Sequence, residues 1–106
     1  MQDAIRTDEH AQATHGQWGQ VGFEGHLGGY LRLRPATVTA YVSDANLASR
    51  WLAANRGLDD LAAASEVDLR AYLSSLGGLT NATVARRVRA LRAFYRYAVQ
   101  TGQLSS

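Results

Sequence analysis

Cysteine and lysine are both absent from the 106-residue sequence, and proline occurs once, at Pro35. Without cysteine the chain can form neither a disulfide framework nor a thiolate metal site. Without lysine it has no phosphate-binding loop of the kind that ends in lysine and serine or threonine. No apolar run approaches the ~20 residues that cross a membrane, and the N-terminus lacks the apolar stretch of a signal peptide. We therefore expect a single-domain cytoplasmic protein that makes no membrane contact.

Residues that commonly carry catalysis or bind metals are few and scattered. The three histidines all lie near the N-terminus at irregular spacing: His10, His15 and His26. Asp59 and Asp60 fall in a predicted turn, and Glu66 and Asp68 fall in the first turn of a predicted helix, where acids complement the helix dipole. No serine in the helical part has a histidine partner for a nucleophilic triad. We expect neither enzymatic activity in this chain nor a metal ion or other cofactor.

Charge is unevenly distributed along the chain. Residues 1–29 hold one arginine and four acidic residues, a net charge of −3, whereas residues 30–106 hold ten arginines and five acidic residues, a net charge of +5. The acidic segment also carries glycine at every third position from Gly16 to Gly28. We interpret residues 1–24 as a flexible, glycine-rich acidic leader. The basic remainder is the expected folded part, and its charge favours a polyanionic partner.

Helical periodicity dominates the folded part. Apolar residues three and four apart predict a helix from residue 36 to about residue 55, which begins at Pro35 and ends before Gly57. Ser65 predicts the N-cap of a second helix, and Thr80 or Asn81 caps a third helix over residues 80–102. A short helix is expected between residues 18 and 33, and no strand pattern occurs. The sequence therefore predicts an all-α, compact four-helix bundle with three clear helices and a short N-terminal one.

The last predicted helix carries five arginines and no acid. Its apolar residues predict one buried face, made of Val84, Val88, Leu91, Tyr95, Ala98 and Val99. Arg86, Arg89 and Arg96 lie on the opposite side, separated by alanines, and Tyr97 is expected there too. None of these arginines has an acid three or four residues away, which predicts that they are available to nucleic-acid phosphates. The alternative is a solvated face whose arginines pair with acids of other helices.

Three segments of the folded part read RPATVTAYVSDANLASRWL from residue 34, SEVDLRAYL from residue 65 and TVARRVRALRAFYRYA from residue 83. In this order they resemble the N-terminal core-binding (SAM-like) domain of tyrosine recombinases and phage integrases of the Xer type. The resemblance implies a SAM-like helical domain over residues 25–104, with the start of an interdomain linker at residues 105–106. In that family a separate C-terminal domain supplies the catalytic residues, and we expect that domain to lie outside this chain.

The resemblance also implies DNA contacts from the starts of two helices. By position these contacts fall on Thr37, Thr39, Ala40, Ser43, Asn81, Thr83, Arg86 and Arg87, and the helical face described above adds Arg89. Threonine and serine hydroxyls suit phosphate oxygens, and Arg86 could bind a guanine edge in the major groove. Thr39 and Ala40 stand where long basic or polar side chains are common in the family, which implies weak intrinsic affinity.

The expected function is therefore that of a non-catalytic DNA-binding module of a site-specific tyrosine recombinase. It would hold duplex DNA through phosphate contacts and limited major-groove contacts during DNA integration and recombination. Its partners would be double-stranded DNA, the C-terminal catalytic domain and neighbouring recombinase protomers. The alternative is a helical protein–protein interaction domain that binds no DNA, which an exposed apolar patch around Tyr97 and Leu104 would favour.

Overall fold

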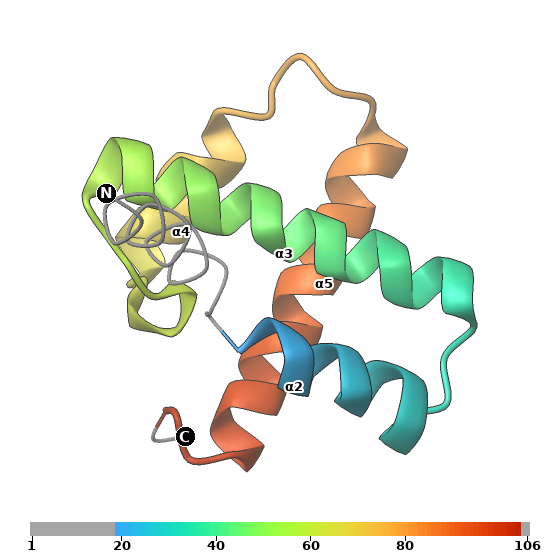
Figure 1. Ribbon diagram of the computed structural model, residues 1–106. Helices are drawn as coiled ribbons and strands as arrows, with labels where there is room; N and C mark the ends of the chain where they lie inside the picture. Colours follow the sequence, from blue (N-terminus) through green and yellow to red (C-terminus); the bar gives the residue numbers. More distant parts are fainter. Residues whose placement is uncertain (1–18, 105–106) are drawn as a thin grey trace, which may run out of the picture.

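The computed structural model describes residues 19–104 (Figure 1). His10, His15, most of the expected leader and the expected start of the linker lie outside these residues. The described chain contains helices α2 (Gln20–Gly25), α3 (Pro35–Arg56), α4 (Glu66–Ser74) and α5 (Asn81–Gln100), a π-helical turn η1 (His26–Tyr30) and a 3-10 turn η2 (Leu61–Ala63). No strand occurs between residues 19 and 104. The predicted all-α bundle, with three main helices and a short N-terminal one, is confirmed.

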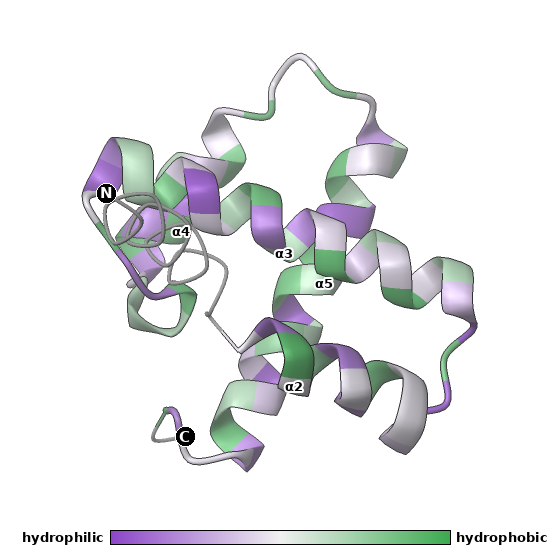
Figure 2. Cartoon of the chain, in the orientation of Figure 1, coloured by the Kyte–Doolittle hydropathy of each residue, from purple (hydrophilic) through white to green (hydrophobic). Residues whose placement is uncertain are grey.

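Helix α3 is the central element of the bundle. It lies across α5 and also contacts α2, η1, η2 and α4 (Figure 1). Figure 2 shows hydrophobic residues recurring along each helix between hydrophilic ones, as expected for helices that each bury one face. The core is formed where these faces meet, and its fully buried larger side chains are Phe23, Leu27, Leu52, Leu61, Tyr72 and Phe94.

The helix ends follow local chemistry that the sequence predicts. Pro35 is the first residue of α3, and Gly57 ends that helix with a φ of 68°, a left-handed conformation that favours glycine. The Ser65 hydroxyl accepts a hydrogen bond from the Asp68 amide, and the Asp68 carboxylate accepts one from the Ser65 amide. The Thr80 hydroxyl accepts from the Thr83 amide at 3.2 Å and so caps α5. Each predicted cap is therefore confirmed.

The helical part of the chain begins earlier than the boundary that the sequence placed at residue 25. Helix α2 begins at Gln20, and Phe23 is fully buried with its ring edge-on to that of Phe94, 5.6 Å between centroids. Residues 20–24 therefore contribute to the core although their composition predicted a flexible segment. A six-residue helix containing glycine has little intrinsic stability, so tertiary packing of its buried aromatic residue holds it.

The buried face of α5 also differs from the prediction. Tyr97 is only 8% exposed, because α2 and η1 cover that side and bring the rings of Phe23 and His26 within 5.7 and 5.3 Å of its own. Val99 is instead 38% exposed. Helix α5 is thus covered from two directions, and its buried residues are Ala90, Leu91, Phe94, Tyr97 and Ala98. With Tyr97 inside, the apolar patch considered around Tyr97 and Leu104 is not formed by that tyrosine.

None of the helices in residues 19–104 combines the length and apolar character that crossing a membrane requires.

Candidate nucleic-acid interface

A groove of about 310 Å³ lies between the start of α3 and the first half of α5. Its lining residues are Ala36, Thr37, Ala40, Tyr41, Arg86 and Arg89. The crossing of α3 over α5 therefore brings together four residues that the sequence singled out from segments about fifty positions apart. The α3 wall is made partly of alanines, so a ligand can approach the helix backbone closely while two arginines reach in from α5.

The remaining predicted contacts from α3 and from the start of α5 lie outside this groove. Thr39, Ser43 and Asn81 are exposed but do not line it. Thr83 already has a hydrogen-bonding partner, because its hydroxyl accepts from the Thr80 hydroxyl at 3.0 Å. These side chains flank the groove along the two helices and can contribute only where a ligand extends beyond it.

Arg86 is held by a carboxylate of the same molecule. Its Nε and Nη2 donate to the two carboxylate oxygens of Asp44 on α3, both at 2.8 Å. This bidentate bond and the negative charge raise the pKa of Arg86 above its ordinary value. The expectation that Arg86 is fully available to an external anion was therefore wrong, and the alternative of pairing with an acid of another helix holds for this arginine. The Arg86 side chain nevertheless remains 41% exposed, and its Nη1 is not used by Asp44.

Arg87 lies on the inner side of the same carboxylate. Its Nε is 3.9 Å from Asp44 Oδ1, and its Nη1 lies 3.5 Å from the Tyr72 hydroxyl. The side chain is only 17% exposed and lines a separate hollow beside Trp51 and Tyr72. Its position against the core disfavours direct contact with DNA. One carboxylate faces two guanidinium groups here, so the cluster keeps a net positive charge.

Arg89 is the exposed cation of the groove. It has no ion-pair partner among residues 19–104 and lies one helical turn from Arg86. Arg96, which the sequence grouped with these two arginines, lines a different groove between α4 and α5. The predicted three-arginine face is therefore divided between two surfaces of the molecule.

The two helix starts beside the groove have no acidic residue in their first turns. Helix α4, in contrast, carries Glu66 and Asp68 in its first turn. A helix N-terminus bears a partial positive charge and unpaired amide groups, which acids in the first turn offset. Because α3 and α5 lack such acids, their starts add to the positive potential of Arg86 and Arg89 and favour an anionic ligand.

The sequence did not identify Asp44 as the ion-pair partner of Arg86. The available signal was an acid adjoining the apolar stripe of a helix, between Val42 and Ala45. A charged residue on a buried face needs a partner of opposite charge, and in the absence of lysine the permanently charged cationic side chains of this chain are all arginines. Identifying which arginine pairs with it requires the crossing of α3 and α5, which sequence periodicity does not give.

Some of the histidine and acidic residues that the sequence singled out have packing or capping contacts where the structure describes them. Residues 19–104 contain no group of three or more histidine, aspartate or glutamate side chains placed to hold a metal ion. His26 packs its ring against Tyr30, with 5.2 Å between centroids. Asp60 caps η2 by accepting from the Ala62 amide at 3.0 Å, and Asp68 caps α4. These acids have the structural roles that the sequence predicted.

The fold and the groove define a small SAM-like helical domain with a basic surface at two helix starts. Residues 22–102 match the family described as phage integrase, N-terminal SAM-like domain. The chain belongs to this family, and its relatives place it among the N-terminal SAM-like domains of Xer-type tyrosine recombinases.

The chain is also similar to curated proteins that are named tyrosine recombinase XerC. The chain is 36% identical over 79 residues to tyrosine recombinase XerC of Lacticaseibacillus casei, and the aligned region covers 73% of this chain and 26% of the relative. It is 32% identical over 91 residues to tyrosine recombinase XerC of Chlorobaculum parvum, which covers 79% of this chain and 27% of the relative. The chain thus spans about a quarter of the length of these relatives. No solved structure matches the chain significantly.

Proposed function

We propose that this chain is a non-catalytic, DNA-holding module of a site-specific tyrosine recombinase. The observation that carries the proposal is the groove in which Arg86 and Arg89 lie beside the acid-free starts of α3 and α5. Duplex DNA would place a phosphate against Arg89 and the remaining Nη1 of Arg86. Backbone amides and hydroxyls at the two helix starts would bind neighbouring phosphate oxygens.

Asp44 gives Arg86 a defined direction in this scheme. A guanidinium group bound through two of its nitrogens to a buried carboxylate cannot rotate freely, so its third nitrogen is presented to the groove at little further cost in entropy. Arg89 has no such support and serves as a mobile point of charge. Base recognition would rest on Arg86 alone, because Asp44 uses its Nε hydrogen and one Nη2 hydrogen, and the two Nη1 hydrogens and the other Nη2 hydrogen are left to donate to a phosphate or to a guanine edge.

Strand cleavage and joining would be carried out by a catalytic domain outside this chain. The match to the relatives covers about a quarter of their length, and residues 22–102 of this chain match the family described as phage integrase, N-terminal SAM-like domain. DNA and such a catalytic domain would be the partners of the module. On its own the module would bind DNA weakly, since only one face of the duplex is contacted.

Titration of a fluorescently labelled duplex at several salt concentrations tests the proposal. Neutralising two phosphates through Arg86 and Arg89 predicts that log affinity falls with log salt with a slope of about −2. In parallel, amide chemical shifts of the isotopically labelled chain should change at the starts of α3 and α5. Binding that does not depend on salt, or an absence of binding at low salt, would contradict the proposal.

A further inference from the structure

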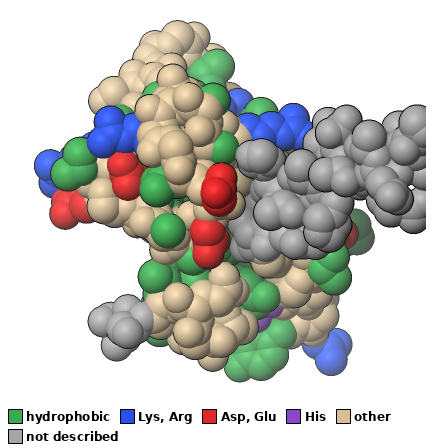
Figure 3. All heavy atoms as spheres, turned by 60° about the vertical axis from the view of Figure 1, so that its left-hand side comes forward, with side chains coloured by type: hydrophobic (Ala, Val, Ile, Leu, Met, Phe, Trp, Pro, Cys, Tyr) green, Lys and Arg blue, Asp and Glu red, His purple; other side chains and the backbone are tan. Residues whose placement is uncertain are grey.

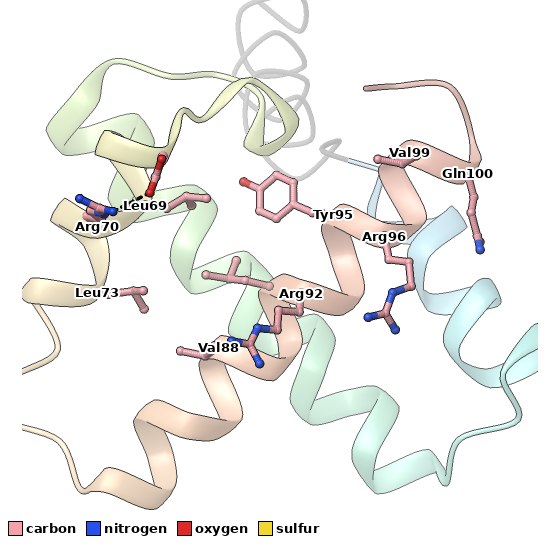
Figure 4. Close-up of a pocket in the computed structure, with 11 residues that line it drawn as sticks. Leu69, Arg70, Leu73, Val88, Arg92, Tyr95, Arg96, Val99 and Gln100 are labelled. Carbon is pink, nitrogen blue, oxygen red and sulfur yellow. Dashed lines mark hydrogen bonds and ion pairs between the residues drawn. The ribbon is translucent and has the colours of Figure 1, made fainter. Parts of the chain in front are cut away.

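A second, larger groove of about 960 Å³ lies between α4 and α5, outside the proposed DNA surface. Leu69 and Leu73 of α4 point toward Val88 and Tyr95 of α5 across it (Figure 4). Its volume is near the upper end of the range of about 300–1,000 Å³ that is typical of ligand pockets. Figure 3 shows the molecule turned so that the α4 side of Figure 1 comes forward. In this view hydrophobic side chains reach the surface between acidic and basic ones.

The α5 wall of this groove is an apolar stripe that the bundle leaves incompletely covered. Val88, Leu91, Tyr95 and Val99 follow one another at steps of three and four along the helix. Only Leu91 is buried, Val88 and Tyr95 are half-buried, and Val99 is 38% exposed. From Val88 to Val99 the stripe rises about 16 Å, the length of about three helical turns. A stripe of this length and spacing matches the apolar face of one helix laid into the groove.

The rims of the groove differ in charge. On the α4 side Arg70 donates to Glu66 at 2.6 Å, so that rim is internally neutralised. On the α5 side Arg92 and Arg96 lie one turn apart at the edge of the groove (Figure 4). Neither arginine has an ion-pair partner among residues 19–104. The groove is therefore apolar along its floor and positive along one edge only.

We propose that this groove binds an amphipathic helix of a partner protein, with an apolar face and two carboxylates four residues apart on the flank that meets α5. The apolar face covers Leu69, Leu73, Val88, Tyr95 and Val99. The two carboxylates, at the spacing of Arg92 and Arg96, pair with these arginines and fix which flank of the partner helix faces α5. This interaction goes beyond the proposed DNA binding and uses a different surface.

The arginine rim also distinguishes this occupant from nucleic acid. Phosphate would be attracted to Arg92 and Arg96, but a duplex has no apolar face to cover the leucine, valine and tyrosine side chains between α4 and α5. A helix with one acidic flank satisfies both the apolar floor and the charged edge. The floor therefore decides in favour of a protein partner.

A designed peptide of about 14 residues tests this assignment on the 106-residue chain. The probe carries leucines three and four residues apart and two glutamates four residues apart on one flank, and the matched control carries lysines in place of these glutamates. We expect the acidic peptide to bind about five- to tenfold more tightly than the basic one at low salt. Amide shift changes should be centred on Leu69, Leu73, Val88 and Tyr95.

Two exposed substitutions locate the binding without disturbing the core. Val99→Asp should weaken binding of the acidic peptide, and Arg96→Glu should remove or reverse the preference for the acidic over the basic peptide. Arg50→Glu makes the same charge change on exposed α3 outside the groove and should leave both affinities unchanged. Circular dichroism checks that each variant keeps its helical content.

Three outcomes would overturn the proposal. The first is equal affinity for the acidic and basic peptides, and the second is no binding of the acidic peptide at millimolar concentration. The third is that duplex DNA, and not the peptide, shifts the amides of Val88, Tyr95 and Val99, which would assign this groove to nucleic acid. Loss of DNA binding at the starts of α3 and α5 would contradict the proposed DNA-holding function and leave these peptide results unaffected.

Discussion

Asp44 and Arg86 form a bidentate ion pair that joins α3 to α5, with both nitrogen–oxygen distances at 2.8 Å. The Asp44 side chain is 1% exposed, whereas that of Arg86 is 41% exposed, so the carboxylate is buried and the guanidinium reaches the surface. A buried carboxylate is tolerated only when it is paired and hydrogen-bonded. The pair therefore links the stability of the bundle to the placement of a cation in the proposed DNA groove.

Replacing the carboxylate of Asp44 should destabilise the fold. In Asp44→Asn the side chain keeps its size, but Arg86 and Arg87 lose the negative charge between them and repel each other. We expect the free energy of unfolding to fall by about 2–4 kcal/mol, less than for a fully buried pair because Arg86 is partly hydrated. Urea denaturation followed by circular dichroism measures this change. Asp59→Asn, an exposed turn residue, is the control, and equal stability of the two variants would contradict a structural role for the pair.

Arg89 should contribute to DNA affinity and not to stability. It is exposed and has no ion-pair partner among the described residues, so Arg89→Ala should leave the urea midpoint unchanged. Loss of one phosphate contact should reduce the slope of log affinity against log salt by about 1. Fluorescence anisotropy with a labelled duplex measures both slope and affinity. Arg50→Ala removes an exposed charge from α3 outside the groove, and an equal slope change in that control would argue against a specific role for Arg89.

The cap of α4 makes stability depend on pH. The pKa of Asp68 lies below its ordinary value of 3.8, first because its carboxylate accepts the Ser65 amide and second because Arg56 donates to it at 2.8 Å. A folded-state pKa below the unfolded one stabilises the fold above about pH 4, and this contribution is lost as the pH falls through the folded-state value.

Asp68→Asn should accordingly lower stability at neutral pH and have a much smaller effect near pH 3. Urea midpoints of the variant and of the unsubstituted chain, measured at both pH values, test this expectation. The control is Asp59→Asn, whose carboxylate is exposed and forms no ion pair among residues 19–104. A stability difference for Asp68→Asn that stays constant between pH 7 and pH 3 would show that the carboxylate charge is not responsible.

The structural features that the sequence predicted correctly are those set by residues adjacent in the chain. Pro35, Gly57, Ser65 and Thr80 set helix ends through local backbone chemistry, and each was predicted correctly. Asp44 and Arg86 are 42 positions apart in the sequence, and they pair because α3 and α5 cross. Periodicity within one helix does not predict which residues of two helices meet.

The buried side of α5 could not be predicted from the sequence either, because it also depends on helices that are distant in the chain. Sequence spacing suggests one buried stripe, but α5 is packed against α3 on one side and against Phe23 of the short α2 on another, so Tyr97 is buried and Val99 is not. The apolar residues between 18 and 33 suggested a short helix, but not that it begins at Gln20, since a single phenylalanine provides its contribution to the core. Arg96 was grouped with Arg86 and Arg89 because their spacing is helical, and only the position of α4 separates them.

The packing of α2 on α5 should be sensitive to one methyl group at Gly22. A Cβ atom added there would overlap the Tyr97 hydroxyl oxygen and lie 3.3 Å from Tyr97 Cζ, so the tyrosine or the helix must move. We expect Gly22→Ala to lower the free energy of unfolding by about 1–3 kcal/mol. Gly25→Ala in the same helix places its methyl where nothing lies within 4 Å, and it should stabilise the fold by about 0.5–1 kcal/mol.

Adding Tyr97→Phe to Gly22→Ala removes the overlapping oxygen and should recover most of the loss, because the remaining contact needs only a small shift. Thermal and urea unfolding of the four chains measure these differences. If Gly22→Ala and Gly25→Ala proved equally stable, or if Tyr97→Phe gave no recovery, the close approach of α2 to α5 at Tyr97 would be refuted.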